Sequence, residues 1–234
     1  RTSGTATNTD KCTLSVWIKR SQLSSNDEII IGEYTDGNNR AKLLFNTDQL
    51  HFFQKTSGST TADVKTTRVF RDPSAWYHIV VAFDTTQSTN TDRIKFYING
   101  VQETAFANTT YPSLNNKIRI NDNSITQLIG YAGTTNTYFN GSMSHIHFTD
   151  GYAYDASAFG STDATTGEWK INTSPSVTYG NNGFFILKDG NSVTDQSGNS
   201  NNFSVGGGTL TKTEDCPSNV FATLNPLSSG SSMT

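Results

Sequence analysis

Short runs of apolar residues recur along the whole chain, and in most of them apolar and polar positions alternate. The clearest run alternates Leu14, Val16 and Ile18 with Ser15, Trp17 and Lys19. Similar runs lie at 29–31, 43–45, 51–53, 76–83, 94–98, 127–131, 143–148, 183–187 and 203–205. Alternation with a period of two places every second side chain on one face of an extended strand. The pattern therefore predicts many short strands, and no segment has the sustained 3.6-residue spacing of a helix.

Turn-forming residues separate these runs. The dipeptides Asp36-Gly37, Asn99-Gly100 and Asn140-Gly141 tolerate positive φ, so each predicts a hairpin turn. Residues 155–167 are mostly small and polar, and we expect a long ordered loop there. Many short strands with regular turns are typical of a sandwich or a barrel. We predict an all-β, two-sheet antiparallel jelly-roll sandwich that hides Val16, Val80 and Ile98 between its layers.

Composition and charge limit the alternatives. The 234 residues are 33% hydrophobic, which is low, but 11% are aromatic, and each buried ring removes a large apolar area from water. The net charge of −3 is scattered, with no Lys/Arg cluster along the chain and no apolar run that could span a bilayer. We therefore expect neither nucleic-acid binding nor membrane insertion. We predict one domain over residues 1–220 and a Ser/Gly-rich linker over 221–234 that leads into an absent segment.

Four segments, taken in order, carry a family resemblance. They are 13–19 (TLSVWIK), 76–84 (WYHIVVAFD), 94–100 (IKFYING), and 129–130 (IG) with 138–141 (YFNG) leading into 143–148. Together they resemble the laminin-G-like, concanavalin A-like superfamily, in which the second and third segments look like the central hairpin. The resemblance implies the same sandwich and a lectin-like role.

A narrower resemblance covers nearly the whole chain. The runs 69–78 (VFRDPSAWYH), 179–185 (YGNNGFF), 195–203 (DQSGNSNNF) and 219–226 (NVFATLNP) are similar to laminin-G-like virion structural or tail-fibre proteins of marine bacteriophages. This implies a non-enzymatic module on the virion surface, outside the cell, that adheres to host surface glycans. The partners it implies are other virion proteins and copies of the same chain. Two alternatives stay open: a structural module that tiles the particle by protein–protein contacts, and a secreted bacterial lectin-like domain.

Glycan binding needs exposed aromatic rings with amide or carboxylate groups beside them. The candidate residues are Tyr97, Asn99, Tyr138, Asn140, Tyr152 and Trp169. For each ring the alternative is packing, with Trp169 closing the edge of the core. Trp17 and Trp76 lie within predicted strands, and we expect them to pack. The glutamates are scattered, unlike the alternating carboxylates of glucanases with this fold, so we predict no catalytic residue.

Metal binding is a second question that the resemblance raises, because superfamily members often hold Ca²⁺ at the sandwich rim through oxygen ligands. The candidate ligands are Asp84, Asp150, Asp195 and Asn199, each of which also suits a tight polar turn. His145 and His147 would share one face of a strand. We expect a solvent-facing pair; the alternative is a metal site, for which no third ligand is evident.

The two cysteines, Cys12 and Cys216, lie near opposite ends of the chain. If the terminal strands pair, a disulfide between them would close a long loop and stabilise the fold by about 3–5 kcal/mol. The alternative is two free thiols, as expected for a particle assembled in a reducing cytosol.

Overall fold

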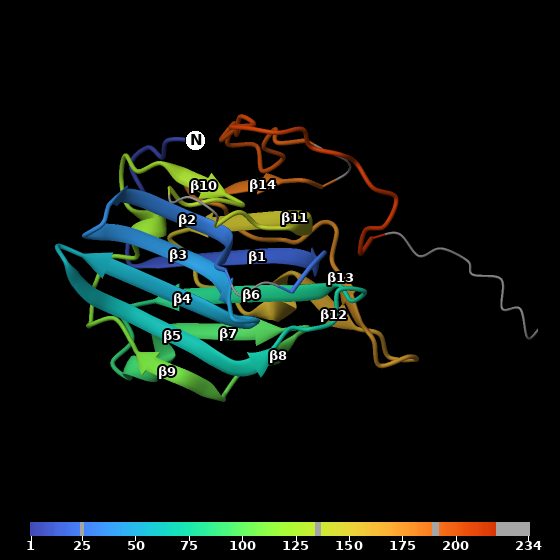
Figure 1. Ribbon diagram of the computed structural model, residues 1–234, viewed down its shortest axis with the longest axis horizontal. Coiled ribbons are helices and arrows are strands. Elements are labelled where there is room, and N and C mark those ends of the chain that lie inside the picture. Colours follow the sequence, from blue (N-terminus) through green and yellow to red (C-terminus); the bar gives the residue numbers. More distant parts are fainter. Residues whose placement is uncertain (24–25, 134–136, 189–191, 219–234) are drawn as a thin grey trace, which may run out of the picture.

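Strands in two layers form the body of the computed structural model, which describes residues 1–23, 26–133, 137–188 and 192–218 (Figure 1). The β1 sheet has six antiparallel strands in the order β14 (Phe184–Ile186), β11 (Gly141–Asp150), β1 (Lys11–Arg20), β6 (Tyr77–Asp84), β7 (Ile94–Ile98) and β8 (Val101–Gln102). The β4 sheet has six in the order β10 (Gln127–Ile129), β2 (Glu28–Asp36), β3 (Asn39–Asn46), β4 (Gln49–Thr56), β5 (Ser59–Val69) and β9 (Phe106–Thr110). The predicted two-sheet sandwich is confirmed.

The core between the sheets follows the alternation of the sequence. Its buried side chains include Leu14, Val16, Ile18, Phe52, Phe83, Phe96 and Ile98. Phe52 and Phe83 meet across the two layers with their ring centroids 4.8 Å apart. Val16 and Ile98 belong to this core as predicted. Val80 is buried as well, but on the other side of the β1 sheet.

Two of the three predicted turns form hairpins. Asp36-Gly37 joins β2 to β3 and Asn99-Gly100 joins β7 to β8, with positive φ at both Asn99 (49°) and Gly100 (82°). The hairpin at Asn140-Gly141 is wrong, because β10 and β11 belong to different sheets and the chain crosses between layers there. The strand predicted over 203–205 is also wrong. Phe203 instead packs against Phe184, with ring centroids 4.7 Å apart.

The predicted loop over 155–167 contains more structure than expected. It includes the 3-10 helix η3 (Ala156–Ala158) and the strand β12 (Gly160–Thr162), which pairs with β13 (Trp169–Ile171). We call residues 155–180 the cover, because Ala156 and Phe159 are buried against Val80 on the outer face of the β1 sheet. Two further 3-10 helices, η1 (Asn90–Asp92) and η2 (Arg119–Asn121), lie in connections between strands. The predicted linker over 221–234 lies outside the described residues.

Candidate functional site

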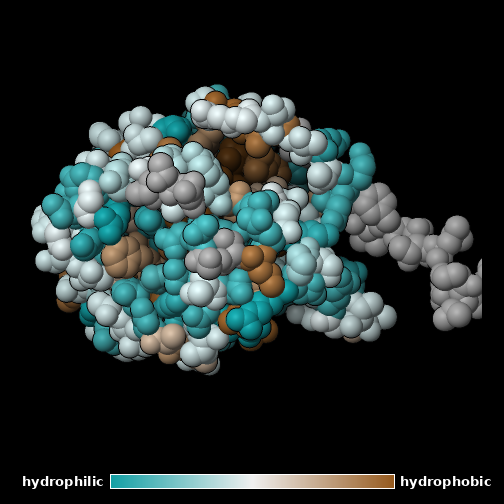
Figure 2. All heavy atoms as spheres, viewed as in Figure 1, coloured by the Kyte–Doolittle hydropathy of each residue, from teal (hydrophilic) through white to brown (hydrophobic). Residues whose placement is uncertain are grey.

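A groove of about 540 Å³ lies at the edge of the sandwich where β10 of one sheet and β11 of the other come together. Residues 209–218, which we call the strap, form its outer wall. In the same region Figure 2 shows a hollow with an apolar floor below the C-terminal part of the chain. The groove exists because β10 and the first half of β11, which β14 does not pair, belong to different layers, so no backbone ladder closes the gap between them.

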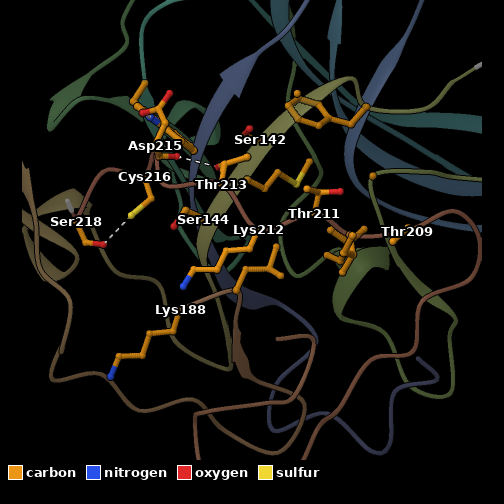
Figure 3. A pocket seen from close by; sticks show the side chains of 18 residues that line it. Ser142, Ser144, Lys188, Thr209, Thr211, Lys212, Thr213, Asp215, Cys216 and Ser218 are labelled. Atoms are coloured by element: carbon orange, nitrogen blue, oxygen red, sulfur yellow. Dashed lines mark hydrogen bonds between the residues drawn. The ribbon is translucent and has the colours of Figure 1, made fainter. Parts of the chain in front are cut away.

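The groove combines two kinds of surface. Its apolar walls come from Ile129, Phe139, Met143, Leu187 and the ring of Trp76. Its polar walls come from Ser142 and Ser144 on β11, from Lys188, and from the threonines and Lys212 of the strap (Figure 3). Ile129, Phe139, Met143 and Leu187 also pack against the main core, so the floor of the groove is held by the fold. Mixed walls of this kind are typical of ligand sites rather than of packing defects.

Asp215 fastens the strap to the sandwich. One carboxylate oxygen accepts a hydrogen bond from Lys19 Nζ at 2.5 Å, and the other accepts one from Trp76 Nε1 at 2.9 Å. Lys19, followed by Trp76, holds the pKa of Asp215 below its usual range. Trp76 was predicted to lie within a strand. The structure places it just before β6, half-buried, where it links the strap to the groove wall.

The predicted glycan-binding residues fall in three places. Tyr138 and Asn140 are exposed beside the groove, on either side of its lining residue Phe139, and Tyr138 stacks on Tyr131 with centroids 4.9 Å apart. Tyr152 is exposed beyond the opposite end of β11. A ten-residue strand extends about 33 Å, so Tyr152 belongs to a different part of the surface.

Tyr97, Asn99 and Trp169 come together, but around His78 and under the cover. Trp169 Nε1 donates to His78 Nδ1 at 2.9 Å, and the two rings stack with centroids 6.0 Å apart. Asn99 Oδ1 accepts from the His78 backbone N–H at 2.7 Å. The half-buried Tyr97 packs in the same cluster. The arrangement matches the packing alternative for Trp169.

The hydrogen bonds of His78 define its protonation. Trp169 can only donate, so His78 Nδ1 accepts and the ring proton lies on Nε2, which is 2.8 Å from Ser15 Oγ. Trp17 stacks on the His78 ring with centroids 4.7 Å apart. Burial, followed by the nearby His145, lowers the pKa of His78 to about 3. Trp17 therefore packs as predicted, but on the covered face of the sheet rather than between the layers.

The expectation that His145 and His147 face solvent is wrong. Both are buried, at 1% and 2% exposure: β14 pairs beside β11 in the sheet, and Phe159 and Tyr179 of the cover pack against His147. His147 stacks on Phe185 with centroids 3.8 Å apart, and its Nδ1 lies 2.8 Å from the Tyr179 hydroxyl. Burial is the main reason that the pKa of His147 lies well below its usual value. His145 Nδ1 lies 2.8 Å from Ser144 Oγ.

The candidate calcium ligands are occupied by hydrogen bonds from the protein. Asp150, fully buried, accepts from the backbone N–H groups of Thr7, Asn8 and Asn182 and from Asn121 Nδ2. Asp195 accepts from Phe185, Ser197 and Asn201 N–H groups, and Asn199 donates to the carbonyls of Gly180 and Gly183. Asp84 accepts from Thr86 and Gln87 and pairs with Lys11. N–H groups directed at these oxygens occupy the positions that a cation would need, so this set does not fit Ca²⁺.

The other acidic and metal-binding side chains of the described residues are also too far apart to share a cation. No group of three or more His, Cys, Asp or Glu side chains in them is placed to hold a metal ion. Asp150 and Asn199 both hold the turn over residues 180–183, through Asn182 and through the Gly180 and Gly183 carbonyls, whereas Asp195 accepts from Phe185 N–H on β14.

Both cysteines are free, so the disulfide is not formed. Cys12 is buried in the core near the start of β1, whereas Cys216 lies in the strap beside Asp215, which bonds to Lys19 near the end of β1. Seven strand residues separate Cys12 from Lys19, or about 23 Å. A disulfide requires Cα atoms within about 7 Å. Burial raises the pKa of Cys12 well above its usual value, which also disfavours its thiolate.

A second cavity of about 520 Å³ lies at the opposite edge, between β7, β8 and β9. Its walls include Phe106, Tyr111, Gln102 and Glu103. The Glu103 carboxylate accepts from Arg68 Nε at 2.6 Å and is buried at 8% exposure. This cavity has fewer apolar walls than the groove and no counterpart of the strap.

Sequence reasoning did not find the groove. Its walls come from residues between 76 and 218, and the contact of Asp215 with Lys19 joins positions 196 residues apart. No motif links such positions. The one available signal was the exposed Tyr138 beside Asn140, which lies next to the groove.

Comparison with known proteins agrees with the architecture. Residues 1–153 match a laminin G family model described as the concanavalin A-like lectin/glucanases superfamily. No curated protein sequence matches the chain significantly. Within the residues that the structure describes, no helix is long and apolar enough to cross a membrane.

Several solved structures resemble the chain at low identity. Domain 4 of AbnA, an extracellular arabinanase from Geobacillus stearothermophilus, has 16% identity and a TM-score of 0.45 over 63% of this chain and 64% of that chain. A putative carbohydrate binding protein from Bacteroides ovatus has 15% identity and a TM-score of 0.43 over 74% and 58%. Tailspike protein 2 of bacteriophage CBA120 has 8% identity and a TM-score of 0.47 over 68% and 24%. This chain thus spans less than two thirds of each. The match over residues 1–153 and the two six-stranded sheets together show that the chain belongs to the concanavalin A-like lectin/glucanases superfamily.

Proposed function

We propose that the domain binds carbohydrate in the groove between β10, β11 and the strap. The observation that carries the proposal is the composition of the groove walls, in which Trp76 and Phe139 lie beside serine and threonine hydroxyls and the ammonium groups of Lys188 and Lys212. A sugar ring presents C–H faces that pack on aromatic rings and hydroxyls that exchange hydrogen bonds with such polar groups. Membership of a lectin/glucanase superfamily supports the same ligand class by analogy of fold.

We infer binding without turnover. Glycoside hydrolysis uses two carboxyl groups on either side of the scissile bond. Among the described residues that line the groove, the one carboxylate is Asp215, and Lys19 and Trp76 already engage both of its oxygens. This arrangement supports a structural role for Asp215 rather than acid or nucleophile chemistry.

We further propose that the domain is displayed on a phage particle and attaches it to host surface glycans. The similarity of runs such as 69–78 and 179–185 to phage virion proteins supports this location. Display of many copies would make weak sites effective, because each bound copy raises the local concentration of the others. The rival role, tiling of the particle by protein–protein contacts, predicts self-association of the chain instead of glycan binding.

A glycan array probed with the 234-residue chain, with Ca²⁺ and with EDTA, tests the proposal. We expect binding to a defined set of glycans that does not depend on Ca²⁺. The affinity of a positive glycan should fall at least tenfold in Trp76→Ala, as measured by titration calorimetry. Tyr152→Ala is the matched control, because Tyr152 is an exposed aromatic residue away from the groove.

Two results would redirect the proposal. Array signals that are absent under both conditions would reject glycan binding and favour tiling, which sedimentation velocity would then show as self-association. A loss of affinity in Tyr111→Ala, with none in Trp76→Ala, would move the site to the second cavity.

A further inference from the structure

The outer face of the β4 sheet gathers basic side chains that are scattered in the sequence. Arg40 and Lys42 on β3, Lys55 on β4 and Lys65 on β5 alternate with core residues of the same strands, so all four point to the outside. This face is turned toward the viewer in Figure 1, and Figure 2 shows that it is mostly hydrophilic. The net charge of the whole chain is −3, so this face differs in sign from the average surface.

Two of these cations are placed against each other. Arg40 and Lys55 are direct cross-strand partners in the β3–β4 ladder. Like charges at directly opposed positions destabilise a sheet. In the described part of the chain, neither side chain has a carboxylate within ion-pair distance; Arg40 instead donates to the Gly37 carbonyl. An anion bound from outside the chain would offset the repulsion between these two side chains.

An aromatic ring lies in the middle of this basic face. Phe53 on β4 is half-buried, pairs with Lys42 on one side and Asp63 on the other, and has the Arg40 guanidinium 5.6 Å from its ring centroid. The ring therefore has the Arg40 guanidinium over it, with Lys42 and Asp63 on the neighbouring strands, and it is partly exposed to solvent.

The two carboxylates of this face do not neutralise it. Asp27 lies 3.8 Å from Lys42 Nζ, and Asp63 lies 2.8 Å from His51 Nε2. Four cations therefore face two carboxylates. Burial is the main reason that the pKa of Lys42 is lowered; Asp27 opposes the shift, and the Arg40 charge adds a smaller lowering effect.

We propose that this face is a second binding surface, distinct from the groove, for an acidic polysaccharide whose sugar carboxylates pair with Arg40 and Lys55 while a sugar ring stacks on Phe53. The surface is a flat sheet rather than a pocket, so it suits an extended polymer. Carboxylate groups match the guanidinium and ammonium donors, and the C–H face of a sugar matches the ring. Duplex DNA is the rival polyanion, but it needs a longer array of phosphate contacts than one cluster around a single ring.

Binding of the 234-residue chain to polygalacturonate in 20 mM NaCl tests this surface, with dextran as the neutral polymer and a DNA duplex as the rival polyanion. We expect polygalacturonate to bind and dextran and DNA to bind at least tenfold more weakly. Arg40→Gln and Lys55→Gln should each lower the affinity for polygalacturonate at least fivefold, and Phe53→Leu should lower it while the thermal midpoint stays near that of the parent chain. Lys170→Gln, on the cover at the other side of the molecule, is the matched control.

The outcomes separate clearly. No binding of polygalacturonate, or wild-type affinity in both Arg40→Gln and Lys55→Gln, would overturn the proposal. DNA binding as tight as polygalacturonate binding would overturn it too, because the face would then recognise charge alone. A chain that keeps this binding but shows no signal on the array of neutral glycans would reject the groove and leave this surface standing.

Discussion

The two sheets of this sandwich are both antiparallel and six-stranded, but their outer faces differ in solvent exposure. Residues 155–180, the cover, pack on the outer face of the β1 sheet and bury Ser15, His78 and His147. The outer face of the β4 sheet is largely open, and there Arg40, Phe53 and Lys55 are only half-buried. Most strands of both sheets alternate inward apolar and outward polar residues, but β6 of the β1 sheet also places Val80 and Ala82 on its outer, covered face. The difference shows that alternation reports which face is the main core, not whether the other face meets water.

Several polar groups on the covered face have partners in the protein, although the buried Trp17 Nε1 has none among the described residues. His78 has partners on both ring nitrogens, and Thr13 Oγ1 donates to the Tyr152 carbonyl while accepting from the Tyr154 N–H. Buried polar groups without such partners would each cost about 1–3 kcal/mol. The open face has no such requirement, which leaves its polar groups available for a ligand.

The largest expected effect comes from removing the centre of the cover. Trp169→Ala takes away a ring that stacks on His78 and leaves His78 Nδ1 without its donor. We expect the free energy of unfolding to fall by about 3 kcal/mol, at the lower end of large-to-small changes because Trp169 is half-exposed. Urea unfolding measures it, with Tyr138→Ala (63% exposed) as a control that should cost little. A small change in Trp169→Ala would mean that the cover is an ordinary surface loop.

Acid should weaken the covered face more than the open one. Burial lowers the pKa of His78 to about 3, whereas unfolded histidine titrates near 6.5. Between these values the unfolded state binds the extra proton, so stability is complete above about pH 6.5 and falls as the pH drops toward 3. The slope is about 1.4 kcal/mol per pH unit for this residue.

Urea unfolding between pH 7 and pH 5 checks this slope. His78→Gln should reduce the slope, with the buried His147 still contributing because its pKa is also lowered, while His51→Gln on the open face should reduce it less. His51 also has a lowered pKa because of its partial burial, but Asp63 opposes that shift. Equal effects of the two substitutions would contradict the distinction between the faces.

A smaller effect of opposite sign is expected on the open face. Lys55→Glu would replace the like-charge pair with Arg40 by an opposite-charge pair, and cross-strand pairs of this kind are worth about 0.2–1 kcal/mol. We expect a slightly higher thermal midpoint at low salt, together with the loss of polygalacturonate binding. In 1 M NaCl the stability difference should disappear. Destabilisation by Lys55→Glu at low salt would show that Arg40 and Lys55 do not repel each other.

The smallest expected effect is that of a reductant. Because Cys12 and Cys216 are free, dithiothreitol should leave the thermal midpoint unchanged. A thiol reagent should modify Cys216 in the folded protein and Cys12 only after unfolding, since Cys12 is fully buried. If both thiols resisted the reagent until dithiothreitol was added, the result would show that Cys12 and Cys216 form a disulfide after all.

Much of the fold could be predicted because it depends on local patterns. The alternation over 13–19 identified β1 and its inward residues, and Asp36-Gly37 and Asn99-Gly100 identified two hairpins through their backbone conformations. The same reasoning failed at Asn140-Gly141. A turn dipeptide specifies a local reversal but not whether the next strand joins the same sheet.

The candidate sites depended on long-range placement instead. Asp150 and Asp195 hold turns rather than a cation because distant N–H groups donate to them. His145 and His147 are buried because β14 pairs beside β11 and the cover packs on His147. The sequence on either side of these residues does not predict any of these long-range contacts.

The sequence by itself determined the class of fold, the inward face of most strands and two of the turns, because period-two burial and positive φ are properties of neighbouring residues. The tertiary structure decided which outer face is covered, where the groove lies and which cations are neighbours. Those features depend on contacts between segments as distant in the sequence as β1 and the strap. The free energy of such contacts is spread over many residues, and no local sequence pattern links those residues.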